Sequence, residues 1–276
     1  MRHIDLLSDP TSWHLHLYDF NAEMDKIVAM HRFLVTVSER DFGNEWDRLM
    51  EGPGDGNYDG GDALWDAEKT VGVSPDDVAS HAGLMAVTRA VSLTEVMLAR
   101  LAAAHLTDPS KWVFPKGSLW QRDWEMKFYK TVLVARFNSE GSGFGALRSL
   151  RDLYVHGYGI PVTETRREAL ARSLYNQFTT ARITPAESSL GYKGEAYFFG
   201  DDAEFSKKTQ TLESAFFTSK RADISPLMTF RVLEQMRSHF ADAHAAFDKG
   251  LVTSSDVNNS KYVKAVEAWW AKQDTS

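Results

Sequence analysis

The chain has 276 residues, of which 43% are hydrophobic and 25% are charged, the composition of an ordinary soluble globular protein. It contains no cysteine, which excludes disulfides, cysteine-ligated zinc and thiol catalysis, and which favours a reducing, cytoplasmic setting. The net charge of −7 argues against a generic nucleic-acid coat, and without a long apolar run we expect neither a signal peptide nor a membrane partner.

The first part of the chain predicts two long helices. Residues 17–50 place apolar side chains at intervals of three and four, the spacing of one buried helix face. The stretch GPGDGNYDGG, residues 52–61, should end this helix in a loop. The stretch SPDD, residues 74–77, then supplies a cap, a first-turn proline and two acids near the positive end of the helix dipole. We therefore expect a second helix from there to about residue 105.

The stretch DGNYDGGDALWD, residues 55–66, matches the first half of a calcium-binding EF-hand loop. The second half does not match, because Asp66 stands where the motif requires a bidentate glutamate and Asp62 where an apolar residue is normal. An acidic, glycine-rich surface loop is therefore the better interpretation of this stretch.

The rest of the chain also follows a helical pattern, with loops predicted over residues 107–120 and 138–145. Further helices are predicted over residues 122–137, 144–156, 163–179, 226–249 and 261–272. Residues 183–208 are the least readable part, and GEAYFFG within them is compatible with a short strand, a buried turn or a mobile flap. Since the chain shows no repeat, low-complexity tract or linker, we predict a single all-α domain over residues 1–276.

The sequence leads us to expect no metal and no cofactor. Its nine histidines include no HExxH motif or other tight zinc spacing, and the pair His14 and His16, which suits one face of an extended segment, has no third ligand nearby. The stretch GSGFGALRSL, residues 141–150, lacks the GxGxxG spacing of a phosphate-binding loop after a strand. We interpret it as a flexible approach to the following helix.

Arg151 and His156 close the helix predicted over residues 144–156, just before the breaker GYGIP. Side chains five residues apart on a helix lie about 140° apart around its axis. If the helix frays at Gly157 and Gly159, both side chains can turn toward one phosphate. Such a pair suits RNA cleavage, since a neutral histidine can take a proton from a ribose 2′-hydroxyl and a guanidinium can hold the phosphate. The alternative is structural: Arg151 pairs with a neighbouring acid and His156 caps the helix end.

The sequence RDLYVH, from Arg151 to His156, resembles the Rx4–6H motif of the HEPN superfamily. Asp152 occupies the polar slot that often follows the arginine, and the H-x-x-G pattern after the motif is like that of some HEPN groups. The preceding helix, residues 86–106, is similar to the long helix of that family with its small-apolar stripe and mid-helix glutamate, here Glu95.

This resemblance covers a core of about residues 75–180, joined by the helix over residues 226–249. It implies an HEPN-like helical bundle with N-terminal and C-terminal helical additions. It also implies a metal-independent endoribonuclease that cleaves single-stranded RNA by attack of the 2′-hydroxyl, in a toxin–antitoxin or phage-defence role.

The same resemblance assigns roles to individual residues. His156 would be the base, Arg151 the phosphate holder, and Asp152 would orient one of them. Tyr158 and Arg148 would contact the RNA, although packing against the next helix is an alternative role for Tyr158.

The resemblance also implies partners. Two copies of the motif usually meet across a homodimer to form one cleft, and a neutralising antitoxin protein is a second implied partner. The stretch over residues 111–174 has a net charge of +5, against −11 for residues 1–110, and would collect the RNA backbone. Two other interpretations stay open: a non-catalytic nucleotide- or protein-binding module of the same family, and a plain helical scaffold with a coincidental motif.

Overall fold

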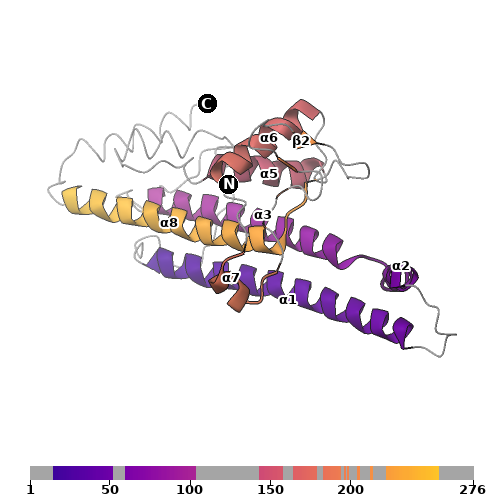
Figure 1. Ribbon diagram of the computed structural model, residues 1–276. Coiled ribbons are helices and arrows are strands. Elements are labelled where there is room, and N and C mark those ends of the chain that lie inside the picture. The colour runs from indigo at the N-terminus through magenta and orange to yellow at the C-terminus, as the bar shows by residue number, and fades with distance from the viewer. Residues whose placement is uncertain are drawn as a thin grey trace. The chain divides into compact units, whose positions relative to one another are not determined.

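Figure 1 shows the computed structural model of the chain, whose described part is predominantly helical. The described residues are 15–51, 60–103, 143–157, 164–178, 183–193, 196, 198, 204–205, 212–213 and 222–254. The helices are α1 (His16–Met50), α2 (Gly60–Val71), α3 (Pro75–Ala103), α5 (Phe144–Gly157), α6 (Glu164–Gln177), α7 (Pro185–Ser189) and α8 (Pro226–Ser254). Two short strands, β1 (Glu204–Phe205) and β2 (Leu212–Glu213), form one antiparallel pair with Phe205 opposite Leu212. The predicted all-α class is therefore confirmed.

The long helices begin and end close to where the sequence predicts. α3 starts at the SPDD stretch, where the backbone N–H of Asp77 donates to the hydroxyl oxygen of Ser74 at 3.1 Å, as expected of an N-cap. α8 also starts at a serine cap, because the N–H of Met228 donates to the hydroxyl oxygen of Ser225 at 3.2 Å. None of the helices in the described part of the chain has the length and apolar character needed to cross a bilayer.

The stretch read as an acidic surface loop is helical from Gly60 onward, so that interpretation is wrong for its second half. Ala63 and Ala67, four residues apart, are fully buried and give α2 an apolar face that the surrounding acids and glycines obscure in the sequence. Asp62 and Asp66 lie on this helix, which also excludes an EF-hand loop over these residues.

Several predictions fall outside the described residues. These are the loop over residues 107–120, the helices over residues 122–137 and 261–272, and His14. His16, which the sequence pairs with His14 on an extended segment, is the first residue of α1 and is buried. The prediction of an extended segment is therefore wrong for His16.

Contacts within the chain divide it into two compact units. Unit 1 comprises Met1–Asp25, Ala90–Gly145 and Glu234–Ser276, and unit 2 comprises Lys26–Arg89 and Ala146–Leu233. The boundaries fall inside α1, α3, α5 and α8 rather than in linkers. Residues 75–180, over which an HEPN-like core is expected, are divided between the two units. The HEPN-like core stays a prediction.

The core of unit 1 is built around aromatic contacts between helices distant in sequence. Phe20 of α1 stacks on Phe240 of α8 with ring centroids 4.3 Å apart, and both side chains are fully buried. Phe144 meets the ring of His239 at 5.1 Å. Arg237 ties the same two long helices at the rim, donating to the carboxylate of Asp25 at 2.6 Å.

In unit 2, α3 comes close to the start of α8 because Gly83 has no side chain. A Cβ added to Gly83 would lie 2.5 Å from Oγ1 of Thr229 and 2.7 Å from Cγ2 of Ile224. Glycine therefore permits a close approach of backbone and side chains that any other residue would obstruct.

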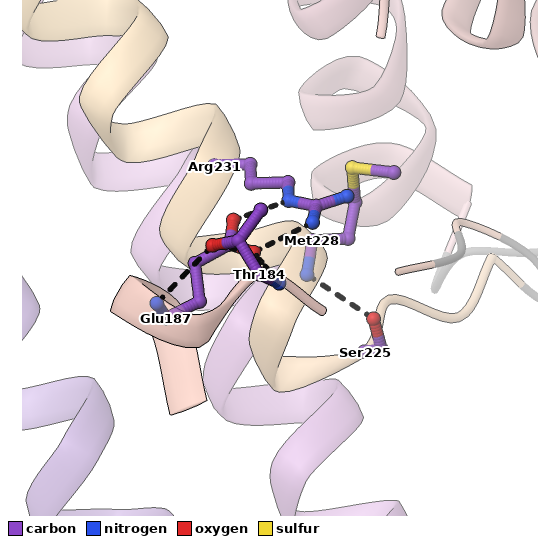
Figure 2. Close-up of polar contacts among 5 residues, drawn as sticks. All are labelled: Thr184, Glu187, Ser225, Met228 and Arg231. Carbon is purple, nitrogen blue, oxygen red and sulfur yellow. Dashed lines mark hydrogen bonds and ion pairs between the residues drawn. The ribbon is translucent and has the colours of Figure 1, made fainter. Parts of the chain in front are cut away.

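The short helix α7 is anchored to α8 by an ion pair, drawn in Figure 2. The carboxylate of Glu187 accepts from Nε of Arg231 at 2.6 Å and from its NH2 group at 2.8 Å. Thr184 and Glu187 also form a reciprocal capping box at the start of α7. The hydrogen bonds from Arg231, with those from Thr184, lower the pKa of Glu187 to about 2.

Further contacts hold the segment that follows α7. Helix α7 lies beside α1 in Figure 1. Arg32 of α1 donates to the carbonyl oxygen of Leu190 at 3.3 Å. The ring of Tyr192 packs on Phe230 at 4.7 Å. Ala196 and Phe198 of GEAYFFG are buried, and the other residues of that stretch lie outside the described part of the chain, so its three alternatives stay open.

Candidate functional site

Helix α5 presents the motif from Arg151 to His156, and its sequence explains why it packs as it does. Its apolar side chains Phe144, Leu147 and Leu150 recur at intervals of three and are almost fully buried. Gly143, with a φ of 75°, precedes the helix in the left-handed region that favours glycine. The helix continues through Gly157, one residue beyond the motif.

Arg151 lies on the buried side of α5, with 8% of its surface exposed. Its guanidinium binds the adjacent carboxylate twice, since Nε donates to Oδ1 of Asp152 at 3.0 Å and the NH2 group reaches the same oxygen at 2.9 Å. The side chain of Asp152 is about half exposed, at 49%. This pair gives the guanidinium a fixed position, and it is also the contact that the structural alternative for Arg151 predicts.

His156 is exposed in the last turn of α5. The helix is regular through Gly157, so Arg151 and His156 both lie within it, whereas Gly159 lies outside the described residues. The side chains of Arg151 and His156 therefore leave the helix about 140° apart within one chain. Asp152 and His156 are four residues apart and share one exposed face.

The two residues predicted to contact RNA have different outcomes. Arg148, one turn before Arg151, is 3% exposed, so its guanidinium does not lie on the surface where RNA would bind. Tyr158 lies outside the described residues. The burial of Arg148 has a sequence-level reason, because position 148 falls on the same helix face as Phe144 and Arg151.

A second histidine, which sequence reasoning missed, approaches the motif helix from α3. The ring of His81 lies 6.2 Å from the ring of Tyr154, centroid to centroid, and the two planes are tilted by 49°. His81 is exposed and Tyr154 is partly exposed. Burial of the Tyr154 ring raises the pKa of its hydroxyl. No spacing in the sequence points to this contact, since the two residues are distant along the chain.

Unit 2 also concentrates arginine on α5 and α6. Arg167 of α6 is 3% exposed, like Arg148, whereas Arg166 and Arg172 are exposed. Among the described residues, no group of three or more histidine, aspartate or glutamate side chains has the arrangement of a metal site.

Comparison of the chain with protein-family models, with curated proteins and with solved structures found no match.

Proposed function

We propose that the protein is a metal-independent endoribonuclease of HEPN type that cleaves single-stranded RNA. The observation that carries the proposal is the guanidinium of Arg151, fixed by Asp152 on a helix whose last turn presents the exposed His156. A held guanidinium and an exposed imidazole are the two groups that 2′-hydroxyl attack on a phosphodiester requires.

In the proposed reaction, neutral His156 takes the proton of a ribose 2′-hydroxyl, and the 2′-oxygen attacks the adjacent phosphorus. The guanidinium of Arg151 donates hydrogen bonds to the phosphate oxygens as negative charge builds on them. Asp152 keeps that guanidinium from rotating, which reduces the entropy lost when substrate binds. The bond from phosphorus to the 5′-oxygen breaks, leaving a 2′,3′-cyclic phosphate.

The charge distribution supports a polyanionic substrate. Residues 111–174, which include α5 and part of α6, have a net charge of +5 in a chain of net charge −7. Local positive charge attracts the phosphate backbone even when the whole protein is acidic.

We place this site in a homodimer. One Arg–His pair offers one base and one phosphate holder, and a second copy across a two-fold axis would supply the acid for the departing 5′-oxygen. The biological role we propose is toxin–antitoxin or phage defence, with a neutralising antitoxin protein as a further partner.

A second candidate function is a non-catalytic nucleotide- or protein-binding module. The observation that favours it is the burial of Arg151, which is 8% exposed and already paired with Asp152. An arginine in such a pair fixes a helix without touching any substrate.

Incubation of purified protein with single-stranded RNA in the presence of EDTA separates the two. The ribonuclease is expected to leave 2′,3′-cyclic phosphate ends, and His156→Ala to lower the rate by about 10²–10⁴-fold. Arg151→Lys should not restore full activity, because an ammonium cannot grip two phosphate oxygens in a bidentate geometry. No cleavage by the wild type across varied RNAs, with unchanged folding, would favour the binding module.

A further inference from the structure

We infer that the outward face of α2, formed by Leu64, Trp65 and Val71, is a docking surface for a basic, amphipathic segment of a partner protein. The inference is independent of the ribonuclease function proposed above. Three features of α2 lead to it: an inverted distribution of large and small side chains, an apolar surface that continues over two helical turns, and acidic charge around the indole.

The large and small side chains of α2 are distributed in the opposite way to those of an ordinary surface helix. Ala63 and Ala67 are fully buried, whereas Trp65 is 71% exposed and Leu64 is 48% exposed. Trp65 lies two residues from each alanine, so its side chain leaves the helix about 160° away from both of them. A surface helix normally buries its large apolar side chains. Helix α2 is instead attached through its alanines and presents its tryptophan to solvent.

The apolar surface continues along the helix and into the turn that follows it. Val71 comes seven residues after Leu64, so the two side chains share one side of α2, about 10 Å apart along its axis. Val71 and the next valine, Val73, are both exposed. Single exposed apolar side chains are ordinary, but several on one face mark an interaction site.

The opposite side of α2 already has a neighbour within the same unit. Thr70 comes seven residues after Ala63 and so lies beside it around the helix. Hydrogen bonds from Arg48 and, to a smaller extent, from Thr70 lower the pKa of the Glu45 carboxyl on α1. The buried side of α2 therefore faces the C-terminal part of α1, and Trp65 points away from it.

Acidic side chains surround this docking face. Asp62 and Glu68 come three residues before and three residues after Trp65, so one carboxylate flanks the indole on each side. The described residues 39–51 and 60–77, which form α2 and the neighbouring parts of α1 and α3, hold ten acidic and three basic side chains. Their net charge of −7 makes this end of the unit strongly negative.

The bases in these ranges do little to neutralise that charge. Arg40 is paired with Asp41 at 2.8 Å, and Arg48 with Glu45 at 2.6 Å, so both guanidinium groups are directed to acids of their own helix. The third base is Lys69 of α2.

This combination of charge and apolar surface selects one kind of occupant. RNA and anionic membranes would be repelled by the acids. A second copy that docked through the same face on a two-fold axis would place acids opposite acids. A basic segment with one apolar face fits, because its apolar side chains can cover Trp65 while its lysines or arginines lie against Asp62 and Glu68.

Binding of two synthetic helical peptides to the full chain, followed by fluorescence anisotropy, tests the inference. One peptide has leucines on one face and lysines on the other, and the second has glutamates in place of the lysines. The wild type should bind the leucine–lysine peptide and not the leucine–glutamate peptide. Trp65→Ala should weaken binding about 30-fold, as for a tryptophan at the centre of an interface. Asp62→Asn combined with Glu68→Gln should weaken it about 5-fold and make it less sensitive to salt.

Phe33→Ala is the matched control. Phe33 of α1 is an aromatic side chain of similar exposure, at 62%, and it lies about 18 Å along α1 from Glu45, where α2 is attached. This variant should bind the leucine–lysine peptide as the wild type does. Circular dichroism checks that each variant is folded, and the double charge variant tests the same face without removing apolar atoms.

Four results would overturn the inference. The docking face is wrong if the wild type binds neither peptide, or if Trp65→Ala binds the leucine–lysine peptide as tightly as the wild type does. Equal binding of the two peptides would refute the preference for a basic partner. If light scattering shows that the wild type self-associates and that Trp65→Ala does not, a second copy covers this face in place of a partner protein.

Discussion

Replacement of Gly83 by alanine should destabilise the protein, although alanine is the better helix former. The new methyl group would lie 2.5 Å from Oγ1 of Thr229 and 2.7 Å from Cγ2 of Ile224, both too close for van der Waals contact. Overpacking of this kind costs about 1–3 kcal/mol, and the gain in helix propensity offsets about 1 kcal/mol of it.

The hydroxyl of Thr229 makes the cost larger. It is fully buried and donates to the carbonyl oxygen of Ser225 at 3.0 Å, so moving it away from position 83 weakens a buried hydrogen bond worth about 1 kcal/mol. The sum for Gly83→Ala is a loss of about 2 kcal/mol in the free energy of unfolding. Urea unfolding followed by circular dichroism measures it directly.

Gly43 of α1 provides a matched control. A Cβ at that position meets no atom within 4 Å, so Gly43→Ala should raise the free energy of unfolding by about 0.5–1 kcal/mol. Thr229→Ala should reduce the cost of Gly83→Ala, because it removes the closest obstacle. If the two glycine variants change stability equally, or if Thr229→Ala leaves the cost of Gly83→Ala unchanged, the close approach of α3 to α8 is refuted.

Three further predictions follow from buried or paired charges. Burial lowers the pKa of His31 from 6.5 to about 4, so below pH 6.5 the unfolded chain takes up a proton that the folded chain does not, and the free energy of unfolding falls. His31→Leu should therefore reduce, by about 2 kcal/mol, the drop in the free energy of unfolding between pH 7 and pH 5. Urea unfolding at both pH values measures this difference. The ion pair of Glu187 with Arg231 stabilises the fold at neutral pH, and this contribution is lost as pH falls from 4.5 toward 2. Glu187→Gln should weaken the attachment of α7 to α8, so tryptic cleavage after the exposed Lys193 should become faster. Arg151→Met should abolish RNA cleavage while the variant still unfolds cooperatively in thermal or urea unfolding. Unchanged acid sensitivity of His31→Leu would contradict the first prediction, and unchanged proteolysis of Glu187→Gln the second. A large loss of stability in Arg151→Met would contradict the third.

Local rules explain why most of the helices could be predicted. The start of α3 follows from the cap, proline and acids at its first turn, and the hydrogen bond from Asp77 to Ser74 is the contact those residue types predict. α2 was missed because only Ala63 and Ala67 mark its buried face, and two alanines among acids and glycines give little periodicity.

Tertiary packing decides what the sequence pattern could not. Arginine is usually at the surface, so residue type alone does not predict that Arg148 and Arg151 are buried. The division into two units is equally hidden, since its boundaries cut through continuous helices that carry no linker composition. The contact of His81 with Tyr154 joins residues distant along the chain, and only the fold brings them together.

The burial of Arg151 is the point where stability and function make different demands on α5. An apolar residue there would extend the stripe formed by Leu147 and Leu150, and replacing a buried ion pair by a hydrophobic residue is often neutral or stabilising. Removing Arg151 would leave Asp152 half exposed and able to bind water. If Arg151→Met folds normally and loses cleavage, the arginine serves chemistry; if it unfolds, the pair with Asp152 serves the fold.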